Sequence, residues 1–289
     1  LVNPKSDFGT RSTPPEQIYL LDHLAEKFNQ LNWSRKKLIA YIVNSKTYKQ
    51  SSIRRKDADE KDPDNHFYHR QNRFRIEGEI VRDIFLSSSG LIKHRIGGPS
   101  VFPPVPDGVA EQSFAGNFKW KTSQGDDRYR RGMYTFFKRT APDPNLITFD
   151  CPDANVSITK RNISNNPITA LATLGNEVFH EAAQSLAKRI IKTFLTQALR
   201  DGFFHGDMHQ GNLKCRNDGT LIVMDFGIMG RIDEYTRKTY AEILIGFLRR
   251  DYLRVAEVHF EAGYVSENQN VQEFSQALRS VGEPIFGME

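Results

Sequence analysis

The sequence predicts a mainly helical protein with some β structure, an α+β fold made of two parts. Apolar residues recur at spacings of three and four along most of the chain, which is typical of amphipathic helices. Residues 96–146 are instead rich in glycine and proline, and short apolar runs flank a turn at 217–219 as in a β-hairpin. A length of 289 residues suits about two domains.

The composition argues against several classes of protein. With 38% hydrophobic residues, including 20 Phe and 10 Tyr, the chain can form cores and does not belong to the disordered class. No apolar run reaches about 18 residues, which argues against a transmembrane helix. Two cysteines are too few for a disulfide scaffold or a four-cysteine zinc site. The net charge of +5 permits an anionic ligand without requiring one, and we expect no nucleic-acid partner.

Both ends of the sequence suggest a fragment. It begins at Leu1 without Met or a signal-peptide pattern, and it stops soon after a helical pattern at 271–278. We therefore do not expect two complete domains.

Three helices are expected before the irregular segment, because apolar side chains repeat at helical spacing over 18–28, 34–43 and 76–85. Ser34 suits the N-cap of the second helix. The polar, charged segment 49–72 indicates a loop.

The irregular segment 96–146 contains Gly97-Gly98-Pro99 and a cluster of prolines at 103–106, which exclude long helices. Arg130–Phe137 suits either a strand or an ordered loop. A segment of this kind is either a surface loop packed by its own aromatic residues or a carrier of binding function.

The last part begins with a long helical pattern over 176–200, which Asp201-Gly202 terminate. A hairpin is expected next, with strands at 213–215 and 221–224 around Asn217-Asp218-Gly219. The remaining helical patterns are 240–250, 252–260 and 271–278.

One constellation carries clear chemistry. Asp207 and Asn212 lie five residues apart in the loop before the hairpin, and Asp225-Phe226-Gly227 follow directly after it. The hairpin returns Asp225 to that loop, so Asn212 and Asp225 are suitable oxygen ligands for Mg²⁺ beside the carboxylate of Asp207. This order is the kinase pattern of a catalytic loop followed by a metal loop. An alternative is metal-dependent hydrolysis with His205, Asp207 and His209 as ligands.

Residues 193–289 resemble the UbiB / aarF-domain family of atypical kinase-like proteins. The matching stretches are Phe194–His205, His205–Leu213, Met224–Asp233, Phe247–Tyr252 and Val258–Tyr264. The resemblance implies part of a kinase-like carboxyl-terminal lobe with ATP and Mg²⁺ as cofactors, and support of ubiquinone biosynthesis at a membrane surface.

The same resemblance assigns Asp207 as the catalytic residue, with His205 beside it. It assigns Asn212 and Asp225 as metal ligands, and places Phe226 and Gly227 with them at the cofactor. A kinase-like fold also needs an amino-terminal lobe with a nucleotide-covering loop, a phosphate-binding lysine and a helix glutamate. Residues 1–192 contain no such pattern. Whether the chain is an enzyme is therefore left open, and we expect no turnover from it alone.

Residues 1–190 resemble a different family, the carboxyl-terminal domain of unknown function in planctomycete proteins with PSD-type or cytochrome-c-like modules. The matching stretches include Arg73–Glu77, Ile80–Asp83, Tyr129–Gly132, Lys138–Thr140 and Phe149–Asp153. No activity follows from this resemblance, and no haem is expected because the chain lacks Cys-x-x-Cys-His.

Basic residues near aromatic stretches leave an anionic or glycan ligand open for this first part: Arg73, Arg75, Arg130, Arg131, Lys138 and Arg139. Cys151 is expected to be structural or incidental rather than a nucleophile, because no motif supplies a base.

Three interpretations of the whole chain compete. It is a join of two unrelated gene fragments near 188–194, or a genuine atypical kinase or ATPase with a substitute first domain, or a non-catalytic binding or scaffold protein. The location is not settled by the sequence, because the kinase-like part suggests a cytoplasmic, membrane-associated protein and the first part an exported one.

Overall fold

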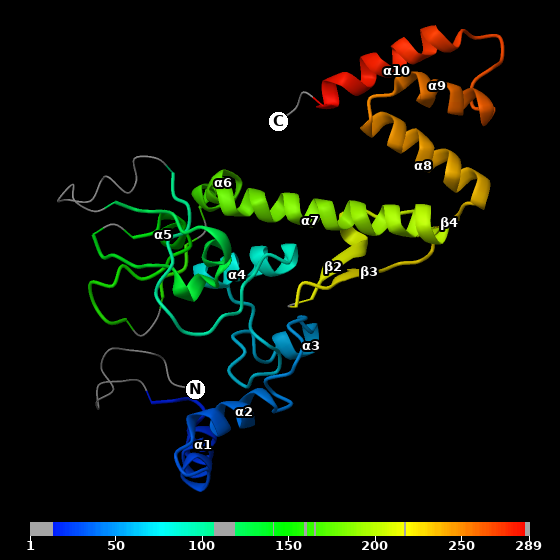
Figure 1. The fold of residues 1–289 in the computed structure, drawn as a ribbon. Coiled ribbons are helices and arrows are strands. Elements are labelled where there is room, and N and C mark those ends of the chain that lie inside the picture. The colour runs from blue at the N-terminus through cyan, green and yellow to red at the C-terminus, as the bar shows by residue number, and fades with distance from the viewer. Residues whose placement is uncertain are drawn as a thin grey trace. The chain divides into compact units, whose positions relative to one another are not determined.

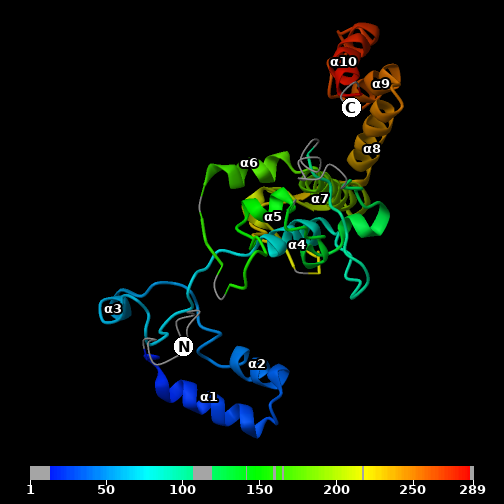
Figure 2. The same cartoon turned by 90° about the vertical axis from the view of Figure 1, so that its left-hand side faces the viewer.

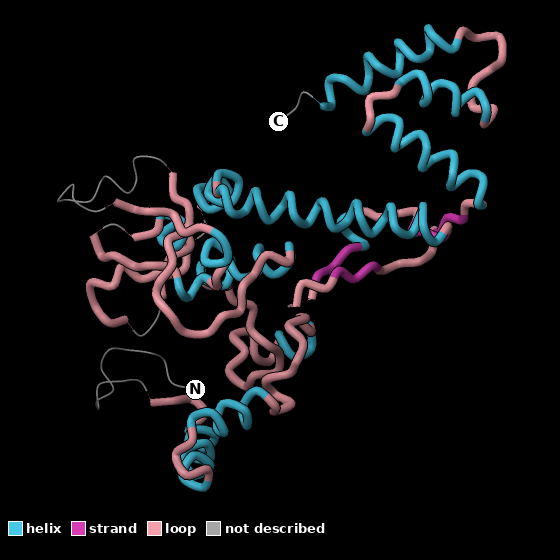
Figure 3. The backbone as a smooth tube through the Cα atoms, in the orientation of Figure 1, coloured by secondary structure: helices cyan, strands magenta, loops and turns pink. Residues whose placement is uncertain are grey.

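The computed structural model describes residues 14–106, 119–140, 142–158, 161–164, 166–216 and 218–286. Its architecture is mainly helical, with two small antiparallel sheets of two strands each (Figures 1 and 3). Contacts divide the chain into two compact units. The first comprises 1–82, 97–124 and 132–176, and the second 83–96, 125–131 and 177–289.

The first unit contains the expected helices α1 (Ile18–Gln30) and α2 (Arg35–Val43), which form a helical hairpin (Figure 2). The predicted N-cap is confirmed, because the Ser34 hydroxyl accepts a hydrogen bond from the Lys37 amide at 3.4 Å. The expected loop 49–72 contains one short helix, α3 (Lys56–Asp59).

Two further helices of this unit were not apparent from periodicity, α5 (Pro144–Thr148) and α6 (Pro167–Gly175). Each begins with proline after a capping side chain, Asp143 or Asn166, which accepts hydrogen bonds from the first-turn amides. The starts of these two helices are therefore set by the capping side chain and the proline, and less by a repeating pattern of apolar residues.

Within the segment 96–146, the described residues 96–106, 119–140 and 142–146 are mostly irregular, as expected, and residues 107–118 and 141 lie outside the description. Arg130–Phe137 forms an ordered loop rather than a strand: it holds a 3₁₀ turn at Gly132–Tyr134, and its β contacts are isolated bridges at Arg130 and Thr135. Nearby, Val101 is 2% exposed and Leu146 6%, which places these residues in the core of the first unit.

The helix α4 (Gly78–Ser89) runs from the first unit into the second, where its last turns pack on α7 (Glu177–Leu195). The rings of Phe85 and Phe179 stack at 4.1 Å, and Leu86 and Val178 are fully buried. This cluster is the apolar contact between α4 and the long predicted helix. The helix ends in a π-helical segment, Thr196–Asp201, and Gly202 (φ 65°) stops it, as expected.

The predicted hairpin is confirmed, with β2 (Leu213–Cys215) and β3 (Leu221–Val223) paired in register Lys214 to Ile222. Asn217 of its turn lies outside the described residues. A second pair, β1 (Phe203–His205) with β4 (Met229–Arg231), was not expected; His205 pairs with Met229. Unlike β2 and β3, the strands β1 and β4 are not joined by a short turn that would indicate a hairpin in the sequence, so only the tertiary pairing defines β4.

Three helices complete the second unit: α8 (Glu234–Leu248), α9 (Tyr252–Glu261) and α10 (Val271–Phe286). The helix α8 begins earlier than its apolar pattern at 240–250, because Asp233 caps its first turn by accepting from the Thr236 amide at 2.9 Å. In the described ranges, no helix combines the length and apolar character needed to cross a membrane.

Candidate functional site

The candidate site lies in the second unit, in the two loops that flank the hairpin. His205 ends β1, and Asn212 closes a 3₁₀ turn (Gln210–Asn212) just before β2. Asp225 to Gly227 follow β3 and lead to β4, the partner of β1. Because the hairpin and the β1–β4 pair both close, the loop after β1 and the loop after β3 come together.

His205 joins these two loops. Its side chain is buried, with 1% of the residue exposed. The Nε2 atom lies 2.9 Å from the main-chain oxygens of both Met224 and Asp225, so it donates to them. The Nδ1 atom accepts from the Asp207 amide at 3.1 Å. Both ring nitrogens are thus used by the backbone, which fixes a neutral tautomer with its proton on Nε2.

Asn212 makes the second connection. It is 7% exposed, and its side-chain Nδ2 donates to the main-chain oxygen of Asp207 at 3.1 Å and lies 3.5 Å from the Asp207 carboxylate. Its main-chain oxygen accepts from the Met224 amide at 2.9 Å. In the described part of the chain no donor is found for the side-chain oxygen Oδ1 of Asn212, so this oxygen is available as a ligand.

Asp225 occupies a left-handed backbone conformation, with φ of 55°. Its side chain is exposed, and Oδ1 accepts a long hydrogen bond of 3.4 Å from the Gly227 amide. Phe226 is 62% exposed, and its ring meets that of His205 edge to face at 5.5 Å. Asp225, Phe226 and Gly227 therefore form an exposed loop, and the buried ring of His205 contacts this loop.

The side-chain oxygens of the two loops fit Mg²⁺ in part. One amide oxygen and two carboxylates, from Asn212, Asp207 and Asp225, are hard oxygen ligands of the kind that Mg²⁺ takes. Within the described residues, no group of three or more His, Cys, Asp or Glu side chains is gathered for a metal ion. The residue types suit Mg²⁺, but the described residues do not gather into a metal site.

The alternative of a His–Asp–His metal centre gains no support. Both nitrogens of His205 are engaged, and Nδ1 of His209 accepts from the Gly211 amide at 3.0 Å. The remaining His209 nitrogen lies 3.6 Å from the Asp207 carboxylate, which makes an exposed ion pair when His209 is protonated.

One contributor to the site was not apparent from the sequence. The side-chain oxygen of Gln197, in the π-helical segment, accepts a hydrogen bond from the His205 amide at 3.3 Å. A single glutamine in a helical pattern gives no local signal for such a role, because the contact depends on the path of the chain after Gly202.

Several of the basic residues expected near an anion are engaged within the protein. Arg75 pairs with Asp150 at 3.0 Å, and Arg131 with Asp83 at 2.8 Å. Arg130 is 1% exposed and donates to the main-chain oxygen of Arg95. Their primary role is therefore structural.

Cys151 is half-buried in the first unit, with its sulfur 3.7 Å from the Glu79 carboxylate. Burial and the nearby negative charge raise its pKa to about 11. This thiol is protonated at neutral pH, which agrees with the expected structural role.

Comparison with known proteins finds two protein families that match different, partly overlapping parts of the chain. Residues 158–259 match the ABC1 atypical kinase-like domain, which includes the two loops of the site. The chain belongs to the PSD1 family, described as protein of unknown function (DUF1553), which matches residues 1–207. The two matches overlap over 158–207, which includes α7 and the start of the site.

Two curated relatives are each named "Probable protein kinase UbiB". The protein of Cronobacter sakazakii (strain ATCC BAA-894) is 42% identical over 125 residues, which are 42% of this chain and 22% of the relative. The protein of Pasteurella multocida (strain Pm70) is 43% identical over 105 residues, 35% of this chain and 20% of the relative. The chain thus spans about a fifth of the length of these relatives. No solved structure matches it.

Proposed function

We propose that residues 203–231 are the metal- and nucleotide-binding half of an atypical-kinase-type site, and that Asp207, Asn212 and Asp225 carry it. The observation behind the proposal is the double connection of the two loops, through the His205 ring to the main-chain oxygens of Met224 and Asp225, and through the main-chain oxygen of Asn212 to the Met224 amide. This connection keeps the two loops that carry Asp207, Asn212 and Asp225 next to each other.

Each residue has a distinct role in this proposal. Asn212 and Asp225 hold Mg²⁺, which neutralises phosphate charge when bound with a nucleotide. Asp207 accepts the proton of the attacking hydroxyl or water. His205 acts as a positioning residue, since its ring is buried and reaches the site only through the backbone of Asp207 and Asp225.

The proposal also includes the absence of turnover by this chain alone. Asp225 and Phe226 are exposed, and the carboxylate of Asp207 is 44% exposed. Electrostatic stabilisation of phosphoryl transfer needs a site that excludes water, because water screens the charges that stabilise the transition state. The ubiquinone-pathway and membrane associations of similar proteins have no counterpart among these residues, and we do not extend the proposal to them.

The experiment is a titration of the whole chain with a fluorescent ATP analogue, with and without Mg²⁺, followed by a turnover assay. Asp225→Asn is expected to abolish the Mg²⁺-dependent part of binding. The matched control is Asp201→Asn, a carboxylate of similar exposure (43%) that pairs with Arg200.

Equal Mg²⁺-dependent binding by both variants would contradict the assignment of Asp225. ATP hydrolysis above background that Asp225→Ala abolishes would contradict the absence of turnover.

A further inference from the structure

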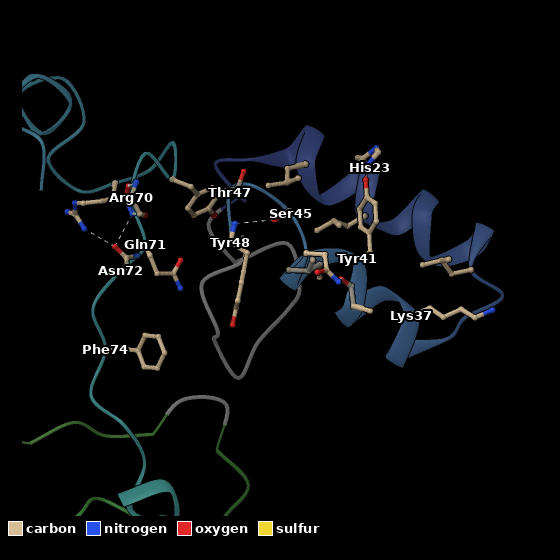
Figure 4. Close-up of a pocket in the computed structure, with 18 residues that line it drawn as sticks. His23, Lys37, Tyr41, Ser45, Thr47, Tyr48, Arg70, Gln71, Asn72 and Phe74 are labelled. Atoms are coloured by element: carbon tan, nitrogen blue, oxygen red, sulfur yellow. Dashed lines mark hydrogen bonds between the residues drawn. The ribbon is translucent and has the colours of Figure 1, made fainter. Parts of the chain in front are cut away.

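A groove with a volume of about 990 Å³ lies in the first unit, between the α1–α2 hairpin and the segment 65–74 (Figure 4). Small-molecule sites typically occupy about 300–1,000 Å³. The groove belongs to the PSD1 match and has no part in the kinase-like site.

Its walls are mostly apolar. The aliphatic and aromatic side chains that line it are Leu20, Leu24, Leu31, Ala40, Tyr41, Ile42, Tyr48, Tyr68 and Phe74. Neither α1 nor α2 has a buried residue, and Phe74 is 73% exposed. Figure 4 shows Tyr48 extending between Tyr41 and Phe74. Apolar surface of this kind is stabilised when an apolar partner covers it.

Hydrogen bonds hold one wall of the groove in place. Asn65 is 3% exposed, and its side chain donates to the main-chain oxygen of Arg70 and to the side-chain oxygen of Asn72, both at 2.9 Å. Gln50 donates to the main-chain oxygen of Tyr68 at 2.7 Å. A wall fixed before binding lowers the entropic cost of holding a ligand.

The Lys and Arg side chains that line the groove have no acidic counterpart among its described lining residues. The described residues that line it include His23, Lys37 and Arg70 but no Asp or Glu. Arg70 is paired with Asp59 at 3.3 Å, and His23 is bonded to the Tyr41 hydroxyl at 3.0 Å. For Lys37 no side-chain partner is found in the described part of the chain, so its ammonium group is the cation open to a ligand.

We propose that this groove binds an amphiphilic anion, a carboxylate with a medium or long alkyl chain. The alkyl chain lies along the apolar wall between α1 and α2, and the carboxylate pairs with Lys37 at the rim, at the end of the groove opposite Phe74 (Figure 4). The apolar walls select the chain, and the ammonium group of Lys37 selects the head group.

The test uses the whole chain and a fluorescent fatty acid as probe, displaced by three competitors of equal chain length: dodecanoate, dodecanol and dodecyltrimethylammonium. We expect saturable binding of the probe. Dodecanoate should displace the probe best. Dodecanol should displace it about fivefold less well, because it lacks one exposed ion pair worth roughly 1 kcal/mol. Dodecyltrimethylammonium should displace it least.

Two variants locate the site. Lys37→Glu is expected to weaken dodecanoate binding at least about fivefold and leave dodecanol unchanged, while its neighbour Lys36→Glu, which does not line the groove, changes neither. Ala40→Phe fills the groove and should weaken all three competitors, whereas Ala25→Phe, on the exposed surface of α1 outside the groove, should not.

Equal displacement by the three competitors, or the same effect from Lys36→Glu as from Lys37→Glu, would overturn the proposal. So would a self-associating chain whose dimer Ala40→Phe disrupts and which takes up no probe, because the groove would then be covered by a second copy.

Discussion

The side-chain amide of Asn212 donates a hydrogen bond to the main-chain oxygen of Asp207 at 3.1 Å. The two residues are five positions apart, and Asn212 is buried while the Asp207 carboxylate is 44% exposed. One residue therefore fixes the loop, and the other presents its carboxylate to solvent.

Asn212→Ala is expected to loosen this loop. The substitution removes the bond from the side chain to Asp207, whose main-chain oxygen keeps the His209 amide as a donor, and is expected to cost about 0.5–1.5 kcal/mol. Amide hydrogen exchange over 203–215 is the suitable measurement, because a chain with two compact units does not unfold in one step. Asn44→Ala is the control, since Asn44 makes a similar bond to the Ala40 oxygen on an exposed helix end. If the two variants accelerate amide exchange equally, and only at the residues next to each substitution, Asn212 does not hold the loop 206–212 in place.

Arg189 connects α7 to two other segments of the second unit. It donates to the main-chain oxygen of Ser88 at 2.8 Å and to that of Gly219 in the hairpin turn. Arg189→Ala is expected to cost about 1.5–3 kcal/mol locally, the range for hydrogen bonds to a charged group.

We expect Arg189→Ala to accelerate amide exchange in both 86–92 and 213–223. Lys188→Ala, at the exposed neighbouring position, should change neither. Ser88 belongs to the PSD1 match alone and Gly219 to the ABC1 match alone. Protection that is independent of Arg189 would show that this contact does not couple the two segments.

Gly246 of α8 lies directly against Val255 of α9, so that an added Cβ would overlap the valine side chain. Gly246→Ala should separate the two helices and cost about 1–3 kcal/mol, as overpacking of a core does. Gly175→Ala is the matched control, because nothing lies within 4 Å of a Cβ at that position. Amide hydrogen exchange of α8 and α9 that Gly246→Ala leaves unchanged, as Gly175→Ala does, would show that the two helices do not pack this closely.

Cys151 should resist alkylation. A pKa raised to about 11 from a reference of 9.0 lowers its thiolate fraction near pH 8 by about a hundredfold. Mass spectrometry after iodoacetamide treatment should find Cys151 unmodified at times when an unstructured thiol has fully reacted. Glu79→Gln removes the neighbouring charge and should accelerate the reaction. Rapid alkylation in the unmodified sequence would contradict a protonated, half-buried thiol.

Glu16 and His66 form an ion pair between residues fifty positions apart, with Asp62 and Asp64 also facing the imidazole. The hydrogen bond and charge of Glu16 raise the pKa of His66 above its reference value of 6.5. The stabilisation is therefore complete below about pH 6.5 and is lost as the pH rises through the raised pKa.

An NMR titration of the His66 ring should place its midpoint above 6.5. Glu16→Gln should move the midpoint down, and Glu26→Gln, an exposed residue elsewhere on α1, should leave it in place. An unchanged midpoint in Glu16→Gln would rule out the pair.

Periodicity and capping determined much of this protein directly. The helices near 18–30 and 35–43 follow from apolar spacing and the Ser34 cap, and the hairpin follows from two apolar runs around a turn. The spacing of Asp207, Asn212 and Asp225 likewise placed these residues in the two loops that flank the hairpin, and their roles stay a prediction. These features depend on neighbours within a few positions, which a sequence pattern records.

Tertiary structure alone decided the rest. The pairing of β1 with β4, the burial of His205 beneath Asp225 and the bond from Gln197 join residues whose contacts depend on the path of the whole segment. The groove beside α2 arises in the same way, because Tyr48 and Phe74 line it from segments far apart in the sequence, and Asn65 holds the segment 65–72 by hydrogen bonds within it. Long-range contacts of this kind leave no periodic trace in the sequence, since each is fixed by chain closure and packing rather than by local propensity.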